Sequence, residues 1–231
     1  MIKAAVFDLD HTLFDRYATL RKIVLTDNPD VLPFKSDIPR EEAAEKWIYA
    51  DKHFIHLGWD RVRRFFNDNN MLRASAQNAD LFREYVVPCF MRTAVPYDFT
   101  LPMLNKLKCM GLKLGLITNG PSELQRAKLK MLGLEDIFDT VLISGEFGAA
   151  KPDTTIFKEM AHLMNLRPEE MLYIGDNPLN DVETSGKAGY IPVWVRTTES
   201  WVFPEIMMPE LQVDTVEEIP EIIEKLIYGG H

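Results

Sequence analysis

The chain has 231 residues, of which 46% are hydrophobic and 26% are charged, proportions that are ordinary for globular proteins and exclude wholesale disorder. Its net charge of −9 argues against a surface that coats nucleic acid. Its two cysteines, Cys89 and Cys109, exclude both a disulfide framework and a cysteine-rich metal site, which suits a reducing compartment.

The N-terminal segment 2–7 is a short apolar run rich in strand-forming residues, and it ends in the acidic turn Asp8-Leu9-Asp10. Lys3, Asp8 and Asp10 interrupt this run too early for the core of a signal peptide. No stretch of the chain approaches the roughly 20 uninterrupted apolar residues of a membrane-spanning helix. We therefore expect a cytoplasmic protein that has neither a membrane nor a nucleic-acid polymer as its partner.

Residues 16–96 differ from the rest of the chain because they lack short apolar strand runs. They carry long helical patterns with charged and aromatic residues, over 41–57 and 59–69. Asp37, Pro39 and Glu41 are typical of a helix start. We predict that residues 16–96 form a helical domain, inserted after the first strand of a core domain that comprises residues 1–15 and 97–231.

Strand and helix patterns alternate from residue 100 onward. Strands are expected at 112–117, 140–143, 171–174 and 190–195, and helices at 101–110, 122–131, 154–164, 180–188 and 217–226. The strands are continuous apolar runs, which are typical of strands buried on both faces. The predicted fold class is α/β: a Rossmann-like parallel sheet with helices on both faces, plus the inserted α-helical domain.

Polar residues follow four of the expected strands. In chain order they are Asp8-Leu9-Asp10-His11-Thr12, then Thr118-Asn119-Gly120, then Lys151, and finally Asp176 with Asp181. Ligands of a doubly wound parallel sheet bind beyond the carboxyl ends of the strands. The sequence therefore predicts one sheet edge that collects four carboxylates, a hydroxyl group and a lysine.

Crowded carboxylates repel one another unless a cation compensates them, and oxygen ligands favour a hard ion such as Mg²⁺. With the ion bound, the same site accepts an anion, because Lys151 adds a second positive charge and Thr118 can bind phosphate oxygens. One carboxylate can attack phosphorus as a nucleophile, while its neighbour two residues on exchanges a proton with the leaving oxygen and with water. The residues thus favour phosphoryl-transfer chemistry.

The ordered set resembles the four motifs of the haloacid-dehalogenase-like (HAD) phosphatases, over about residues 1–15 and 97–228. The resemblance implies Asp8 as the nucleophile and Asp10 as the general acid and base. It also implies Mg²⁺ held by Asp8, the backbone carbonyl of Asp10 and Asp176, with Asp181 in support through water or Lys151. The residues implied to bind the phosphoryl group are Leu9, Asp10, Thr118, Asn119, Gly120 and Lys151.

An insertion between the first two motifs matches the subgroup of this family in which a helical cap closes over the active site and selects the substrate. Three stretches look similar to bacterial pyrimidine 5′-nucleotidases and to N-acylneuraminate-9-phosphatases: residues 116–120, then Gln125 with Lys128, and residues 138–152. The predicted function is hydrolysis of a small phosphorylated metabolite, with a nucleoside 5′-monophosphate as one candidate. An acylneuraminate-9-phosphatase-like sugar phosphatase and a phosphoglycolate phosphatase are the alternatives.

Three less favoured activities stay open. A dehalogenase would use Asp8 to attack carbon and would need neither Asp10 nor Mg²⁺, so the presence of Asp10 speaks against it. A phosphomutase would use the same residues and return the phosphoryl group to the sugar. A phosphoaccepting regulatory module would carry its phosphoacceptor after a central strand well into the chain and would need no large cap. The sequence gives no oligomeric state.

Overall fold

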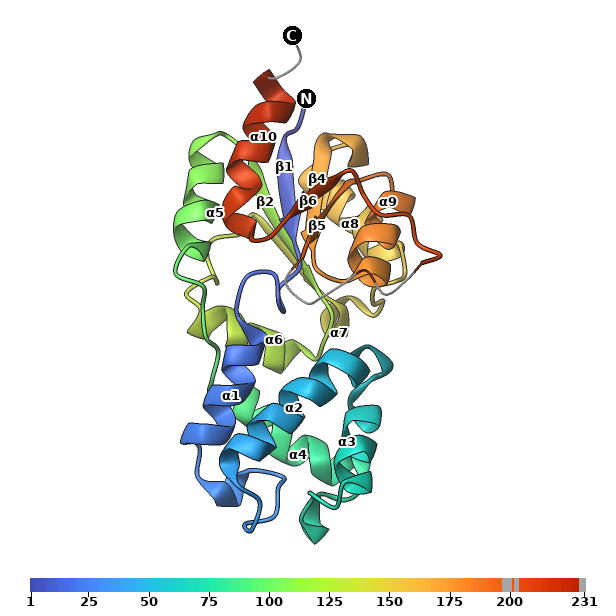
Figure 1. Ribbon diagram of the computed structural model, residues 1–231. Helices are drawn as coiled ribbons and strands as arrows, with labels where there is room; N and C mark the ends of the chain where they lie inside the picture. The colour runs from blue at the N-terminus through green and yellow to red at the C-terminus, as the bar shows by residue number, and fades with distance from the viewer. Residues whose placement is uncertain (197–200, 202–203, 229–231) are drawn as a thin grey trace. The chain divides into compact units, whose positions relative to one another are not determined.

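The computed structural model describes residues 1–196, 201 and 204–228 (Figure 1). The chain divides into two compact units, Met1–Asp15 with Pro96–His231 and Arg16–Val95. We call them the core unit and the helical unit. Residues 197–200, 202–203 and 229–231, which belong to the predicted core domain, lie outside the described residues.

A six-stranded parallel sheet forms the centre of the core unit, in the order β3-β2-β1-β4-β5-β6. Its strands are β1 (Ala4–Phe7), β2 (Lys113–Thr118), β3 (Thr140–Ile143), β4 (Met171–Gly175), β5 (Ile191–Val195) and β6 (Leu211–Val213). Phe7 is aligned with Leu116 on β2 and with Ile174 on β4. The chain therefore leaves β1 beside the carboxyl ends of both neighbouring strands. This sheet confirms the predicted α/β class.

Helices cover both faces of the sheet. They are α5 (Thr100–Cys109), α6 (Ser122–Met131), α7 (Ser144–Phe147), α8 (Thr155–Met164), α9 (Thr184–Lys187) and α10 (Ile219–Tyr228), with short turns at η4 (Pro168–Glu170), η5 (Pro178–Glu183) and η6 (Val216–Glu218). Phe157 of α8 packs with Val6 and Tyr173 in a buried cluster on one face. Alternate residues such as Phe7 point to the other face, where α5 contacts β2 and α10, as Figure 1 shows.

The expected helix over 180–188 is a π-helical turn, η5, followed by the short helix α9. The amide of Val182 donates to the carbonyl of Asn177 five residues earlier, and the Asn177 side chain accepts from the amides of Leu179 and Asn180. This wider turn brings Asp181 back to the start of its own loop, where its Oδ2 accepts from the Asn177 amide at 2.9 Å. Such turns are frequent at functional sites.

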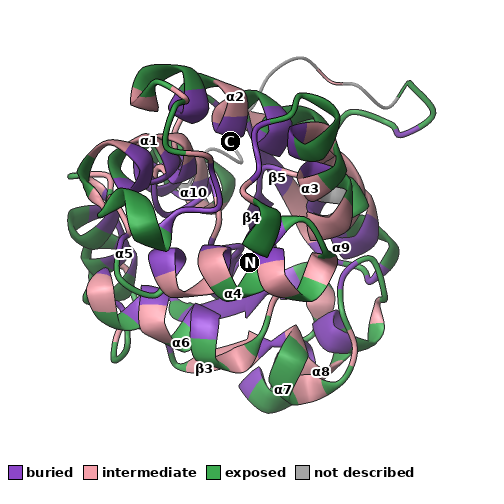
Figure 2. Ribbon diagram, turned by 90° about the horizontal axis from the view of Figure 1, so that it is seen from below, coloured by how far each residue is buried: buried purple, intermediate pink, exposed green. Residues whose placement is uncertain are grey.

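The short elements α7 and β6 were not predicted from the sequence. By contrast, α6 and β3 have the bounds that the sequence predicted, and β4 is buried along its whole length, as its purple colour in Figure 2 shows. The predictions were accurate where apolar runs were long and bounded by turn residues.

The helical unit contains α1 (Arg16–Thr26), α2 (Arg40–Phe54), α3 (Trp59–Asp68) and α4 (Ala79–Phe90), with turns η1 (Pro29–Val31), η2 (Ile55–Leu57) and η3 (Ala74–Ala76). Trp47 is fully buried and meets the rings of Phe34, Phe66 and Phe90 edge-on. These contacts form an aromatic core within the unit. Across the described ranges, none of the helices has the length and apolar character needed to cross a membrane.

Candidate active site

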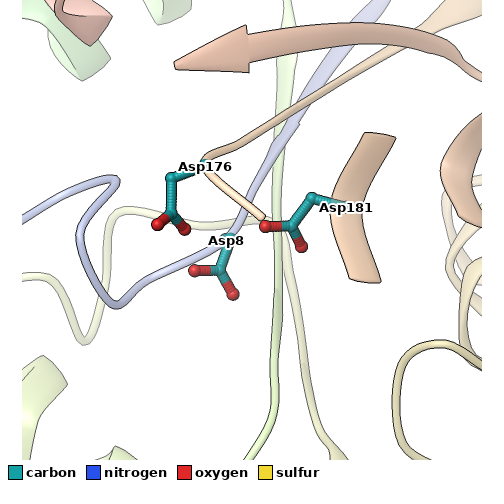
Figure 3. Close-up of side chains that lie close together, drawn as sticks. All are labelled: Asp8, Asp176 and Asp181. Carbon is teal, nitrogen blue, oxygen red and sulfur yellow. The ribbon is translucent and has the colours of Figure 1, made fainter. Parts of the chain in front are cut away.

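Three carboxylates from three segments meet at the carboxyl edge of the sheet. Asp8 directly follows β1, Asp176 directly follows β4, and Asp181 lies in η5. One oxygen of each lies within 4.8 Å of the others, and all three residues are buried. Figure 3 shows the three side chains gathered at this point. The fold thus brings together acidic residues that are up to 173 positions apart in the sequence.

Lys151 supplies the positive charge of this cluster. Its Nζ donates to Oδ1 of Asp8 and to Oδ1 of Asp181, both at 2.6 Å, and to the hydroxyl group of Tyr173 at 2.9 Å. Asn119 holds the backbone of the lysine on both sides, because its Nδ2 donates to the Lys151 carbonyl at 2.8 Å and its Oδ1 accepts from the Lys151 amide at 3.0 Å. The ammonium group is therefore fixed between two carboxylates.

If all three carboxylates were ionised, they would outnumber the ammonium group of Lys151 in this buried cluster by two charges. Burial and the charge of Asp181 raise the pKa of Asp8 to about 7, against the opposing effect of Lys151. Burial, together with the charges of Asp181 and Asp8, raises the pKa of Asp176 well above its usual range. Burial opposes the charged form of Lys151, but the attraction of the two carboxylates is stronger and raises its pKa. The cluster therefore favours the uptake of positive charge.

The donor set fits a hard divalent cation such as Mg²⁺. The available ligands are carboxylate oxygens, and two positive charges would balance the excess of the cluster. Both oxygens of Asp181 are engaged, one by Lys151 and one by the amide of Asn177. This arrangement suits Asp8 and Asp176 as ligands, with Asp181 as a neighbouring support.

The side chain of Asp10 has a different environment. Among the described residues, the carboxylates that could share a metal ion are Asp8, Asp176 and Asp181, without that of Asp10. Both oxygens of Asp10 accept from Nζ of Lys128, at 2.7 and 2.8 Å, and Oδ2 also accepts from Nε2 of Gln125 at 3.1 Å. A contribution of Asp10 to the metal would therefore come from its backbone carbonyl.

The remaining sequence-predicted residues lie around these two groups. Thr118 ends β2, is buried, and accepts a hydrogen bond on its hydroxyl oxygen from Nε2 of Gln125. Gly120 has a φ of 147°, and a Cβ there would lie 3.1 Å from the Gln125 side chain. The side chain of Leu9 is fully buried, so any contact that this residue makes with a phosphate would be through its backbone.

Three residues of the site were not singled out by the chemical argument from sequence: Tyr173, which contacts Lys151, and Gln125 with Lys128, which contact Asp10. Gln125 and Lys128 were noted for a resemblance alone. Their pattern did contain a signal, because they are three residues apart on α6 and share its buried side with Leu124 and Leu129. Polar residues on the buried face of a helix next to a catalytic loop indicate specific partners.

Known proteins resemble this chain over most of its length. The model of the haloacid dehalogenase-like hydrolase family matches residues 2–189. A glyceraldehyde 3-phosphate phosphatase of Methanocaldococcus jannaschii is 34% identical, with 98% of this chain and 99% of that protein covered. The pyrimidine 5′-nucleotidase YjjG of Escherichia coli is 26% identical (94% and 96% covered), and the mouse N-acylneuraminate-9-phosphatase is 25% identical (97% and 95% covered).

A solved structure has a similar fold over nearly the whole chain. The HAD phosphatase from Thermococcus onnurineus has a TM-score of 0.62 and 26% sequence identity, with 96% of this chain and 98% of that chain covered. The family resemblance predicted from the motifs is therefore confirmed by both sequence and structure.

Gly175 provides a test of the carboxylate geometry. A Cβ at this position would lie 2.5 Å from Cγ of Asp181, so we expect Gly175→Ala to displace that side chain. Loss of an outer support typically weakens metal affinity by about 10–100-fold. Calorimetric titration with Mg²⁺ measures the effect.

Gly186→Ala is the matched control, because its nearest contact is Pro192 at 3.9 Å. We expect this variant to bind Mg²⁺ as the unmodified protein does. An unchanged Mg²⁺ affinity in folded Gly175→Ala would contradict the supporting role of Asp181.

Proposed function

Because the chain belongs to the haloacid dehalogenase-like hydrolase family and is a phosphatase of small phosphorylated substrates, we propose that it hydrolyses phosphomonoesters through an aspartyl-phosphate on Asp8. One observation carries the proposal: Lys151 bridges Asp8 and Asp181 while Asp176 lies within 4.8 Å. This arrangement compensates part of the charge of the nucleophile and keeps it in one orientation.

In the first half of the proposed reaction, an oxygen of Asp8 forms a bond to phosphorus as the bond between phosphorus and the ester oxygen breaks. Asp10, protonated by water in the second half of the preceding turnover, gives this proton to the departing oxygen, which leaves as an alcohol. Lys151 and the Thr118 hydroxyl group bind oxygens of the transferred group, with backbone amides of Leu9, Asp10, Asn119 and Gly120 as further donors. The product of this half is an acyl phosphate on Asp8.

In the second half, water attacks phosphorus and gives a proton to the Asp10 carboxylate. The bond between phosphorus and Asp8 breaks, inorganic phosphate leaves, and Asp8 recovers its carboxylate. One carboxyl group thus serves as nucleophile and the other as acid and base. This division requires two unlike environments, and the contacts of Asp8 with Lys151 and of Asp10 with Lys128 are unlike.

We propose Mg²⁺ as the cofactor, bound by Asp8, the Asp10 carbonyl and Asp176, with Asp181 in support. When bound, the ion offsets negative charge on the phosphoryl group and on the surrounding carboxylates.

The division of the chain into a core domain and a substrate-selecting cap, residues 16–96, also stays a proposal. Its support is the insertion of the helical unit directly after the loop that carries Asp8 and Asp10. The predicted cytoplasmic location and absence of nucleic-acid partners stay predictions.

A short sugar phosphate is our first candidate substrate, because the relative at 34% identity is a glyceraldehyde 3-phosphate phosphatase. A nucleoside 5′-monophosphate is the second candidate, since a pyrimidine 5′-nucleotidase is 26% identical over nearly all of both chains. The two candidates share the phosphoryl group and differ in the leaving alcohol. The core site described above contacts the part that they share, so a substrate screen is needed to separate them.

Replacement of the nucleophile tests the covalent step. We expect Asp8→Asn to lower phosphatase turnover by a factor on the order of 10⁴ or more, because an amide does not form an acyl phosphate under these conditions. Release of inorganic phosphate measures turnover, and rapid quenching followed by mass spectrometry detects one added phosphoryl group on the unmodified enzyme. Substantial turnover by folded, purified Asp8→Asn would contradict the proposed nucleophile.

Removal of divalent ions tests the cofactor. We expect EDTA to abolish phosphate release and added Mg²⁺ to restore it, since without a cation the crowded carboxylates would repel an anionic substrate. Circular dichroism of the same samples controls for unfolding. Full activity after exhaustive chelation would rule out the proposed metal requirement.

A phosphate-release screen tests the substrate. The panel comprises glyceraldehyde 3-phosphate, pyrimidine nucleoside 5′-monophosphates, N-acylneuraminate 9-phosphate and phosphoglycolate. We expect the highest kcat/KM for glyceraldehyde 3-phosphate. A preference for dUMP or dTMP would instead identify a nucleotidase, and recovery of an isomeric sugar phosphate would identify a phosphomutase.

A further inference from the structure

The carboxylate of Asp10 is held by two side chains of one helix. Nζ of Lys128 donates to both of its oxygens, at 2.7 and 2.8 Å, and Nε2 of Gln125 donates to Oδ2 at 3.1 Å. Both donors lie on α6, the helix that follows β2, and Thr118 is the last residue of β2. All four residues belong to the core unit. Neither donor has a step in the reaction proposed above.

The ammonium group of Lys128 is buried between two partners from the turn after β1. The side chain of Lys128 is only 3% exposed, although a lysine is among the residues least often buried. Its Nζ lies 5.5 Å from the centre of the Phe14 ring as well as against the Asp10 carboxylate. Asp10 and Phe14 are themselves paired through their backbones. The turn after β1 therefore supplies two partners for the same ammonium group.

Gln125 connects Asp10 to the phosphate-binding residue on the neighbouring strand. Its Nε2 donates to the hydroxyl oxygen of Thr118 and to the carbonyl of Asn119, in addition to Asp10. Within the described part of the chain, its Oε1 is buried without a hydrogen-bond partner. An apolar side chain of similar size would fill the same space without burying an unpaired oxygen. The presence of an amide at position 125 is therefore best explained by the hydrogen bonds that its Nε2 donates.

The contacts with Lys128 and Gln125 hold the side chain of Asp10 in one orientation. The Asp10 side chain is 23% exposed, so without partners it could point into solvent. A proton-transfer group is effective when it is held within hydrogen-bond reach of the reacting atom, and small displacements from that position are costly. Two donors on one helical turn define the position of both carboxylate oxygens.

We propose that Lys128 and Gln125 are positioning residues that hold the Asp10 carboxylate beside Thr118 in the orientation needed for proton transfer. The inference rests on the proposed acid–base function of Asp10. It assigns to α6 a role in turnover that is distinct from substrate binding, because the two side chains act through Asp10.

A double-mutant cycle tests this inference. Lys128→Met removes the ammonium group at similar length, and Gln125→Leu removes the amide at similar volume. With the best alkyl phosphate of the substrate screen, whose alcohol needs a proton to leave, and saturating Mg²⁺, we expect each variant to lower kcat by about 10–100-fold and to leave KM within about threefold. In an Asp10→Asn background, Lys128→Met should change kcat by less than about twofold, since its effect passes through Asp10, and Gln125→Leu should change kcat by a smaller factor than it does in the unmodified enzyme.

Lys130→Met is the matched control, because Lys130 is exposed on the same helix, and its kinetics should equal those of the unmodified enzyme. Thermal unfolding and circular dichroism identify any variant that fails to fold, and Gln125→Leu provides the cycle if Lys128→Met does so. Effects that multiply with Asp10→Asn, or a raised KM at constant kcat, would show direct substrate contact and overturn the inference.

The design separates the inference from the function on which it rests. Full activity of Asp10→Asn would overturn the acid–base role and the inference together. Loss of activity in Asp10→Asn with full activity in both Lys128→Met and Gln125→Leu would overturn the inference alone.

Discussion

Three carboxylates crowded together in a buried position at the carboxyl edge of the sheet are the constraint around which the core unit is organised. Carboxylates removed from water are costly unless they are paired and hydrogen-bonded. Lys151 pairs with Asp8 and Asp181, and the amide of Asn177 completes the contacts of Asp181. In the function proposed above, a divalent cation balances the remaining charge. The same excess that makes the site unfavourable by itself therefore makes it suited to a hard ion.

The structure separates two carboxylates that are only two residues apart in the sequence. Asp8 belongs to the cluster of three carboxylates, whereas Asp10 forms an ion pair with Lys128. The turn between β1 and Phe14 makes this separation, and His11 within it has a φ of 64°, in the left-handed region. The backbone therefore directs neighbouring carboxylates to different partners, which is the condition for two different chemical roles.

The relatives named above are phosphatases and a nucleotidase, whose substrates have a phosphoryl group in common. A phosphatase of a three-carbon sugar, a nucleotidase and an acylneuraminate phosphatase all match this chain over most of its length. In the proposed reaction, the residues at the sheet edge act on the phosphoryl group, which these substrates share. Selectivity among phosphorylated metabolites must therefore come from residues outside this charged cluster, in keeping with the use of one fold for many substrates.

The sequence by itself determined the α/β class, the strands that are long apolar runs, and the acidic, hydroxyl and lysine residues that follow them. These features are local, because apolar periodicity and turn residues act over a few positions. It did not determine the π-helical turn that returns Asp181 to Asn177, nor the contacts of Gln125 and Lys128 with Asp10. The contacts with Asp10 join segments that are more than 100 residues apart. The π-helical turn has a geometry that no periodic sequence pattern encodes. Only the tertiary structure could decide them, because the register of β1 between β2 and β4 sets which side chains meet.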